Sequence, residues 1–405
     1  MKISQLIILL LCVVGLNAQN TNTTPPVSNV KDTAHKPNEW YKKIALRGYA
    51  QVRYNRLLET NPNLKNESGD KSWGDKGGFF IRRARMIFSG NPHERVYIYV
   101  QFDLASQVSS SLPNAHFTQI RDCYFDLNLD KKKEYRLRVG QSKVPYGFEN
   151  MQSSQNRLAM DRTDGINSAT PNERDLGVFG YWAPAKIHDR FAYLVSSGLK
   201  GSGDYGVIGL GVYNGQSANK VEVNNKQHIV AHFAYPFLLI KKQYVEIGAH
   251  AYTGTFTIDK NAKSKGGTDF LDQRVCGSFV VYPQPLGIQM EYNVGKGPEF
   301  NSADSSVQLK NLKGGYIQLM YLKKLKTQQF VPFLRYHFYD GGKKAETDAR
   351  SYGVKDLEIG LEWLPFLNFE LSADYTISQR RFEDYNKPVN SQKGSLLRLQ
   401  AQFNF

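Results

Sequence analysis

One stretch of the chain decides the fold: Arg95-Val96-Tyr97-Ile98-Tyr99-Val100-Gln101-Phe102-Asp103-Leu104-Ala105. Every second residue from Val96 to Leu104 is apolar, and the residues between them are polar, charged or tyrosine. Successive side chains of a β-strand point to opposite faces, so a period of two predicts a strand with one apolar and one polar face. A helix would repeat about every 3.6 residues instead.

The same alternation recurs along most of the chain, as in residues 44–55, 356–363, 367–375 and 397–405. Segments of about 9–12 residues are long enough for a tilted strand to cross a membrane. A soluble sandwich would also alternate, but charge on the polar face of so many strands, with aromatic residues near their ends, favours an outer-membrane barrel. Because backbone groups in lipid need partners, we predict an all-β antiparallel sheet that closes on itself.

The connections alternate in length. Short ones, such as 91–94, 130–134 and 364–366, separate long ones, such as 58–77, 107–117, 295–312 and 378–394. Short periplasmic turns and long outer loops are typical of these barrels. The count is about 16 strands; residues 190–213 could form one bulged strand or two, which makes 18 the alternative. The last strand ends in Phe405, and a terminal aromatic resembles the signal read by the barrel-assembly machinery.

The beginning of the chain is expected to direct export. Residues 1–18 combine Lys2, an apolar run from Leu6 to Val14 and a small residue, Ala18, as a secretory signal peptide does. Residues 19–43, rich in Asn, Thr and Pro, are the expected flexible periplasmic leader, and residues 44–405 the barrel domain. No later window approaches 18 uncharged apolar residues, so strands must make the crossing. The expected location is the outer membrane of a Gram-negative bacterium.

The charge of the chain points to anions. The formal net charge is +15 at pH 7. Export argues against nucleic acid as a partner, so attraction of small anions is the better interpretation. Guanidinium groups stay charged and bind oxyanions through paired hydrogen bonds. Several weak sites in series would let an anion pass through the pore, whereas one tight site would hold it. Alternation places six arginines on lumen-facing sides of strands: Arg47, Arg53, Arg83, Arg85, Arg136 and Arg138.

Arg82 breaks this pattern, because strict alternation turns it toward lipid. A charge facing lipid at mid-depth costs about 2–4 kcal/mol. Arg82 is therefore expected either in a β-bulge that turns it inward or at the rim of the membrane, where it could snorkel. A plainer interpretation is that residues 82–85 are a solvated basic strand end.

Residues 144–172 form a long connection with poor alternation, on the outer side after the fifth strand. A loop of this length without regular structure is usually functional. Our hypothesis is that it folds into the lumen and narrows it, with Arg157 or Arg162 lining the gap. The alternative is a loop that stays on the surface.

Six stretches carry a family resemblance: Arg47-Gly48-Tyr49-Ala50-Gln51, Phe80-Ile81-Arg82-Arg83-Ala84-Arg85, Gln101-Phe102-Asp103, Arg121-Asp122-Cys123-Tyr124, Val139-Gly140-Gln141-Ser142-Lys143-Val144-Pro145-Tyr146-Gly147 and Arg174-Asp175-Leu176-Gly177-Val178. Together they resemble the phosphate-selective porin O and P family. The resemblance implies a 16-stranded barrel, a homotrimer and an inward-folded third loop. It also implies that Arg82 and Arg83 form part of an anion site that Asp122 faces. The family's loop lysine has no counterpart, since residues 144–171 offer only Arg157 and Arg162.

The sequence thus predicts an outer-membrane porin for passive diffusion of small anions, with phosphate or polyphosphate as the implied solutes, through a water-filled lumen with an arginine-lined constriction. One alternative is a general nutrient porin without phosphate selectivity. It rests on acidic residues of later strands, which would split the wall into basic and acidic sides: Glu246, Glu358, Glu362, Glu370 and Asp374. The other is a structural or assembly barrel with a plugged lumen and no transport role.

Catalytic chemistry is not expected. The histidines are scattered, and no Ser-His-acid, metal-ligand, phosphate-loop or dinucleotide motif stands out. We therefore expect no enzymatic activity, no catalytic residue, no metal and no cofactor. The expected partners are small anionic solutes, outer-membrane lipid, the barrel-assembly machinery and further copies in a homotrimer, with no nucleic acid.

Overall fold

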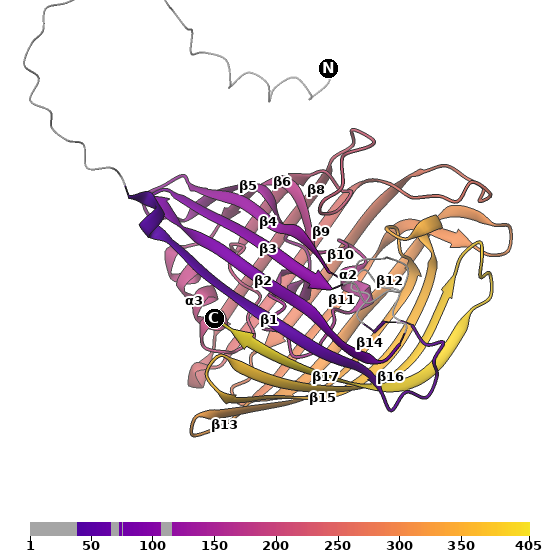
Figure 1. The fold of residues 1–405 in the computed structure, drawn as a ribbon. Coiled ribbons are helices and arrows are strands. Elements are labelled where there is room, and N and C mark those ends of the chain that lie inside the picture. The colour runs from indigo at the N-terminus through magenta and orange to yellow at the C-terminus, as the bar shows by residue number, and fades with distance from the viewer. Residues whose placement is uncertain (1–38, 66–72, 75, 107–115) are drawn as a thin grey trace, which may run out of the picture. The chain divides into compact units, whose positions relative to one another are not determined.

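The computed structural model describes residues 39–65, 73–74, 76–106 and 116–405. The predicted signal peptide and most of the predicted leader lie outside the described residues, as do parts of the first two outer loops. The compact unit Trp40–Phe405 is a closed barrel of tilted strands (Figure 1).

The wall strands pair antiparallel with their neighbours in sequence, and β13 continues β12 along the same edge of β14. The described residues therefore form sixteen wall strands, which confirms the predicted barrel and its count and makes the alternative of 18 strands wrong. The bounds are β1 (Ile44–Leu57), β2 (Gly78–His93), β3 (Val96–Ser106), β4 (His116–Asn128), β5 (Tyr135–Lys143), β6 (Arg174–Trp182), β7 (Ile208–Tyr213), β8 (His228–Leu238), β9 (Tyr244–Thr257), β10 (Asp269–Val281), β11 (Leu286–Asn301), β12 (Ser306–Tyr321), β13 (Lys323–Leu325), β14 (Gln328–Gly342), β15 (Ser351–Phe366), β16 (Phe369–Glu383) and β17 (Ser391–Asn404).

The two ends of the sheet meet at β1 and β17, with Tyr49 opposite Asn404. The terminal residue takes part: the Phe405 N–H donates to the Gly48 carbonyl at 3.0 Å, and the Gly48 N–H donates to the Phe405 carbonyl at 2.7 Å. Closure leaves no sheet edge in the hydrocarbon layer, where an unpaired backbone group would cost several kcal/mol. The chain end thus completes the hydrogen bonding of the wall.

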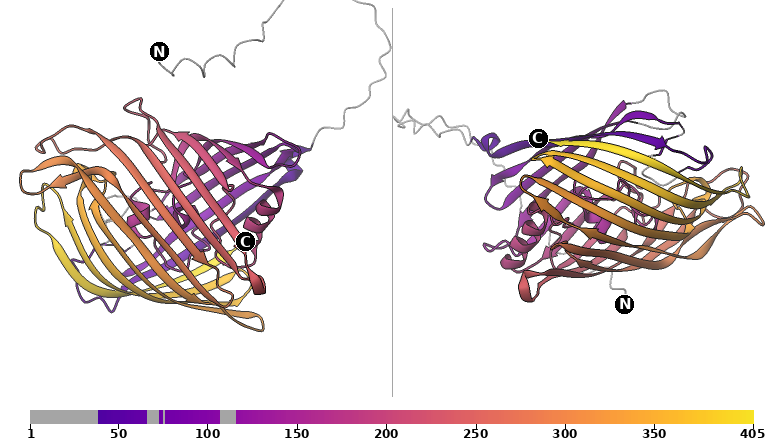
Figure 2. Two further views of the ribbon diagram at one scale, coloured as in Figure 1. Left: turned by 180° about the vertical axis from the view of Figure 1, so that it is seen from behind. Right: turned by 90° about the horizontal axis from the view of Figure 1, so that it is seen from below.

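Helices are few in the described residues and are not part of the wall. They are α1 (Phe148–Met151), α2 (Asp164–Asn167), α3 (Ala185–Ser196) and the 3-10 turns η3 (Trp40–Lys43), η4 (Ile240–Lys242) and η5 (Thr347–Ala349). No helix in these ranges has the length and apolar character needed to cross a membrane. Figures 1 and 2 place α3 and the C-terminus at one end of the barrel and the long loops at the other.

Residues 190–213 contain one strand, which fits the count of 16, but they begin as a helix and not as a strand. They hold the end of α3, a coil and the six residues of β7. Ile187, Phe191 and Leu194 are buried on one face of α3, at helical spacing. An apolar repeat of three to four residues packs as a helix, so this period overrides the strand interpretation.

The outer face of the wall is apolar and the inner face is polar. Outward residues at mid-height remain 41–51% exposed, as Ile317, Leu334 and Ile359 show. Their chain neighbours point inward and are buried, as Gln318 and Arg335 show. Burial therefore alternates along the strands as the sequence predicted.

Two groups of aromatic rings mark the limits of the apolar band. Phe330 and Trp363 stack with ring centroids 5.9 Å apart near the turns, and Tyr336 and Phe338 lie 6.4 Å apart nearer the loops. A tilted strand rises roughly 2.5 Å per residue along the membrane normal, so Phe330 and Phe338 of β14 are about 20 Å apart in height. This spacing fits an apolar band of about 25 Å between aromatic girdles.

The orientation of the wall can be tested by placing a charge on its outer face. We expect Ile359→Arg to lower the free energy of unfolding by about 2–4 kcal/mol, because the side chain faces lipid at mid-depth, whereas Gln379→Arg nearer the rim should cost about 0–1 kcal/mol. Urea unfolding in lipid vesicles measures both. Equal effects would contradict the assigned membrane depth.

Candidate functional site

Strand β2 contains a β-bulge at the arginine-rich stretch. In its pairing with β1, Gln51 lies opposite Arg83 while Val52 lies opposite Ile81, so Arg82 is the extra residue. A bulge breaks strict alternation and can re-aim a side chain. Arg53 and Arg83 are buried on the inner face of the wall, and Arg82, the bulged residue, is half-buried and lies near both.

Arg83 and Arg85 of β2 both form hydrogen bonds with side chains of the wall. The Arg83 guanidinium donates to the Gln51 side chain at 3.0 Å. Arg85 donates to the Asp103 carboxylate and to the Tyr49 hydroxyl, both at 2.9 Å. These arginines are thus held in fixed positions on the inner wall, each by a polar neighbour on an adjacent strand.

The outer loop L3 (residues 144–173) contacts inward-facing arginines of distant strands through its carboxylates. Asp161 pairs with Arg53 at 3.3 Å and also with Arg398 of β17. Asp164 of α2 pairs with Arg380 of β16 at 3.1 Å. Because these partners lie on the inner face of the wall, this part of L3 lies inside the barrel.

A third carboxylate of L3 continues this pattern. Glu149 pairs with Arg335 of β14 at 2.7 Å and accepts hydrogen bonds from the Thr163 N–H and hydroxyl, both at 2.8 Å. The Phe148 and Glu149 N–H groups donate to the Glu291 carboxylate of β11 at 2.6 and 2.8 Å. Acidic side chains, with backbone N–H groups at one point, therefore hold L3 against the wall.

The two arginines of L3 interact mainly within the loop. Arg162 pairs with Glu173 at 2.6 Å and donates to the Gln152 carbonyl at 3.0 Å. Arg157 donates to the Met160 carbonyl at 3.3 Å. Both side chains are buried, and these contacts give them a role in shaping L3.

A second segment enters the barrel from the turn side: T3 (residues 183–207), which contains α3. Lys200 pairs with both oxygens of Glu362 on β15, at 2.6 and 2.7 Å. The Gln152 side chain of L3 donates to the Lys200 carbonyl at 2.7 Å, so T3 and L3 touch each other. The sequence predicted short turns at this end, and nothing in the strand pattern indicated T3.

The contact between T3 and L3 includes an apolar cluster. Leu194 and Leu199 of T3 pack with Phe148 and Leu158 of L3 and with inward residues of β10 to β14, including Phe333. Near the barrel end, Arg136 of β5 and His188 of α3 pair with Asp204 at 3.4 and 2.7 Å. Burial acts in the opposite direction, but these two cations lower the pKa of Asp204 to about 2. T3 is thus fastened by charges and by apolar packing.

The acidic residues expected to make one side of the wall negative are engaged by partners. Glu358 pairs with Arg335, Glu362 with Lys200, and Asp374 with Arg398 at 2.9 Å. Glu246 accepts a hydrogen bond from the Tyr282 hydroxyl at 2.6 Å, and Glu370 accepts one from Ser372 at 3.0 Å. Much of this acidic charge is balanced by T3 and by arginines that also hold L3.

A cavity of about 190 Å³ remains between T3, L3 and the wall of β1 to β6. Arg138 stacks on Tyr124, with its guanidinium carbon 3.9 Å from the ring centroid, and pairs with Asp126 at 2.7 Å. Asp122 accepts two hydrogen bonds from Arg174, at 2.9 and 3.0 Å. Five basic residues and one carboxylate line this basic cavity: Arg47, Arg85, Arg138, Lys143, Arg174 and Asp122.

Arg47 differs from the other basic residues of this cavity. It is exposed and lies over the Tyr99 ring at 5.7 Å, and it makes no ion pair among the described residues. Lys143, by contrast, donates to the Met151 and Gln152 carbonyls at 2.8 and 2.7 Å. The sequence did not predict Lys143 and Arg174 as site residues, because they stand at strand ends, just outside the loop 144–172 that was expected to line the lumen. Only their position next to L3 could have indicated them.

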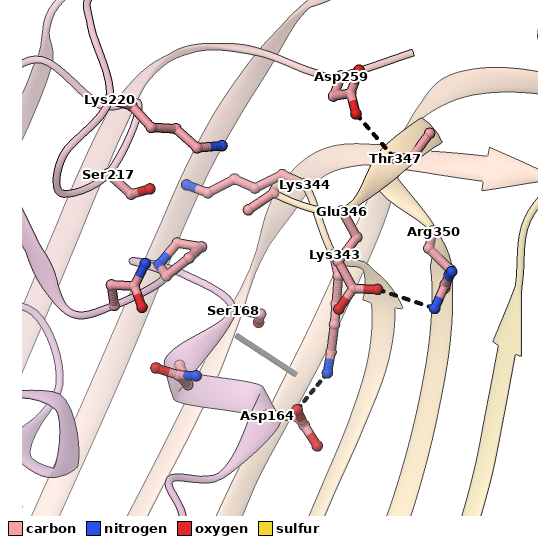
Figure 3. A pocket seen from close by; sticks show the side chains of 14 residues that line it. Asp164, Ser168, Ser217, Lys220, Asp259, Lys343, Lys344, Glu346, Thr347 and Arg350 are labelled. Carbon is pink, nitrogen blue, oxygen red and sulfur yellow. Dashed lines mark hydrogen bonds and ion pairs between the residues drawn. The ribbon is translucent and has the colours of Figure 1, made fainter. Parts of the chain in front are cut away.

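A second cavity, of about 370 Å³, opens among the outer loops L3, L4 (214–227), L5 (258–268) and L7 (343–350). Figure 3 shows Lys220 and Lys344 projecting toward the same space beside Ser217. Lys343 pairs with Asp164 at 2.5 Å. Burial lowers the pKa of Lys343, although the carboxylate of Asp164 acts in the opposite direction.

The family model of the phosphate-selective porins O and P matches residues 63–405. The chain belongs to this family. A comparison with curated protein sequences found no significant match.

Solved structures of bacterial proteins share the fold at low sequence identity. The outer membrane channel DcaP of Acinetobacter baumannii is 14% identical, with a TM-score of 0.53 over 89% of this chain and 97% of that one. OmpF of Salmonella typhi, solved with daunomycin, is 12% identical, with a TM-score of 0.55 and the same coverage. OmpT of Vibrio cholerae, in a trimer form, is 10% identical, with a TM-score of 0.50 over 90% and 100%. The protein is an outer-membrane porin of a Gram-negative bacterium.

The ion pair between Lys200 and Glu362 gives a direct test of T3. We expect Lys200→Met to leave a buried carboxylate unpaired, at a cost of about 3–5 kcal/mol, and so to release T3 from the wall. Single-channel conductance in planar bilayers should rise, and protease cleavage within 197–207 should become faster.

The matched control is Lys186→Met, because Lys186 is exposed on the same segment. If Lys200→Met leaves both conductance and cleavage unchanged, T3 does not obstruct the lumen.

Proposed function

We propose that this porin passes small anions of the phosphate class by passive diffusion. The observation that carries the proposal is the excess of basic side chains around a cavity that remains open inside the barrel. Acidic residues of the later strands are engaged by Lys200 and by arginines that also hold L3, while the cavity beside β1 to β6 is lined by five basic residues and one carboxylate. The space left open is therefore basic, and a basic passage concentrates anions.

The proposed route enters at the outer cavity, where Lys220 and Lys344 face each other, and leaves at the basic cavity. Arg53 and Arg83, together with Arg82 if the bulge turns it inward, are the proposed intermediate sites. Asp122, Arg136, Arg138, Arg157 and Arg162 are proposed to shape the passage. Most of these groups already have polar partners, so a passing oxyanion must compete with resident oxygen atoms. Competition keeps each site weak, which conduction requires.

One observation favours the broader alternative of a general nutrient porin. L3 contributes no lysine, and Arg157 and Arg162 donate to carbonyls and to Glu173 of their own loop. A narrow phosphate filter needs donors that are free to turn toward the ion. Selectivity among anions therefore depends on the wall arginines of β1 to β5.

We also propose that the porin forms a homotrimer. The six residues of β7 rise roughly 15 Å when tilted, less than the apolar band of about 25 Å. The outer face beside it is apolar, with Leu176, Val178, Leu210 and Val212 46–60% exposed. A second copy would cover this low wall, and OmpT of Vibrio cholerae is an outer membrane protein of the same fold with a trimer form.

We also propose which parts of the chain direct its export and its assembly into the membrane. Residues 1–18 are the proposed signal peptide and residues 19–43 the proposed leader of the barrel domain 44–405. The C-terminal strand ending in Phe405 is the proposed contact for the assembly machinery. The proposed activity is diffusion without catalysis.

The function is tested by planar-bilayer recordings of the purified porin in a potassium chloride gradient, followed by addition of phosphate. We expect an anion-selective reversal potential and a reduced chloride current when phosphate competes for the basic sites. A cation-selective potential would contradict the proposal, and absence of any conductance would favour a structural barrel.

Arg47 should contribute measurably to this selectivity, because it is an exposed charge at the basic cavity. We expect Arg47→Gln to lower the anion-to-cation permeability ratio by roughly 1.4- to 5-fold, the equivalent of about 0.2–1 kcal/mol for an exposed charge contact. Arg95→Gln, at an exposed turn outside the cavity, is the matched control. Equal ratios in the two variants would remove Arg47 from the pathway.

A further inference from the structure

The outer wall carries lysines that the transport pathway does not use. Lys296 of β11, Lys313 of β12, Lys355 of β15 and Lys393 of β17 are all exposed. The first three lie on the outer face of their strands, as do lipid-facing residues such as Val294. Lys393 lies directly opposite Gln379, which also points outward. We call them the outer lysines. They point away from the lumen, so they need another explanation.

The outer lysines lie at the aromatic girdle on the side of the outer loops or beyond it toward those loops. Lys355 lies directly opposite Phe338 of that girdle. On β11, Lys296 follows Tyr292, whose ring lies 6.2 Å from that of Phe338. Aromatic girdles mark the membrane interface, so the lysines lie at the level of lipid headgroups and not in the hydrocarbon, where each would cost about 2–4 kcal/mol.

Nearby carboxylates do not neutralise these lysines. Asp340 lies across from Lys313 but pairs with Arg381 at 3.0 Å, and Arg381 also pairs with Glu383 at 3.1 Å. Among the described residues, none of the four outer lysines makes an ion pair. This face therefore keeps a surplus of positive charge beside the membrane.

A groove of about 900 Å³ runs over β8 to β14 at the same place. Val275 and Val294 lie two residues nearer the turns than Gln273 and Lys296 on the same strands, and Lys313 lies directly opposite Val294. Asn311 lies opposite Lys296, and Asp340 completes the polar part of the lining. Apolar side chains and lysines thus lie side by side on one outer surface, as an acyl chain and a phosphate are joined in an anionic membrane lipid. Both the shape and the charge of the groove are complementary to such a molecule.

We propose that this groove binds a phosphorylated lipid of the outer leaflet, with its acyl chain against Val275 and Val294 and its headgroup phosphate on Lys296 and Lys313. The binding surface lies on the outside of the wall and is independent of the proposed passage of anions. Asn311 and Gln273 supply further hydrogen-bonding groups at the headgroup. Lys355 and Lys393 extend the same basic level around the barrel.

The test is native mass spectrometry of the detergent-purified porin with lipid A that carries both phosphates and with lipid A from which both have been removed. Wild type should retain the phosphorylated form preferentially. Lys296→Gln combined with Lys313→Gln should weaken that retention roughly 30-fold, since each lysine near an anionic lipid surface contributes about five-fold. Lys296→Arg combined with Lys313→Arg should preserve it.

Lys131→Gln combined with Lys132→Gln is the matched control, because it removes two exposed lysines from a turn at the opposite end. The outer variant should keep wild-type chloride conductance, which shows that the barrel is folded. Equal retention of the two forms of lipid A by wild type would overturn the proposal. So would undiminished binding by the glutamine variant, or an equal loss in the control.

Discussion

Every backbone N–H and C=O group in the membrane must find a partner within the protein, and the rest of the structure depends on this constraint. It closes the sheet between β1 and β17 and recruits the backbone of Phe405 into the last hydrogen bonds. Closure fixes an inside and an outside for every strand. Residues with alternating polarity then have no freedom in what they face, so arginine, glutamate and aspartate collect on one inner surface.

The many ionised groups on the inner surface are paired with groups of opposite charge. Carboxylates of L3 form ion pairs with Arg53, Arg380 and Arg398 of the wall, and Lys200 of T3 forms an ion pair with Glu362. Buried ion pairs add little net stability, but removing one partner is costly, so they fix the position of whatever carries them. Both inward segments are thus placed by charge pairing with the same sector of the wall, β15 to β17 and β1, and the space they leave is the basic side of the lumen.

The strands of the wall could be predicted from the sequence because their period of two is a local pattern. Residues from Val96 to Leu104 reveal a strand without knowledge of any neighbour, and the cost of exposing a charge to lipid was enough to predict a bulge as one of two places for Arg82. The inside was harder to predict. Asp161 and Arg398 are 237 positions apart, and no local pattern links them. T3 was misread because the helical spacing of Ile187, Phe191 and Leu194 lies in a region where strands were expected.

The hydrogen bond from Gln152 to the Lys200 carbonyl joins a loop that enters from outside the cell to a turn that enters from the periplasm. The apolar packing of Leu199 with Leu158 strengthens the same junction. Because the two segments share this junction, neither can swing aside without disturbing the other. The interior of the barrel is therefore bridged by two segments in contact, one from each mouth.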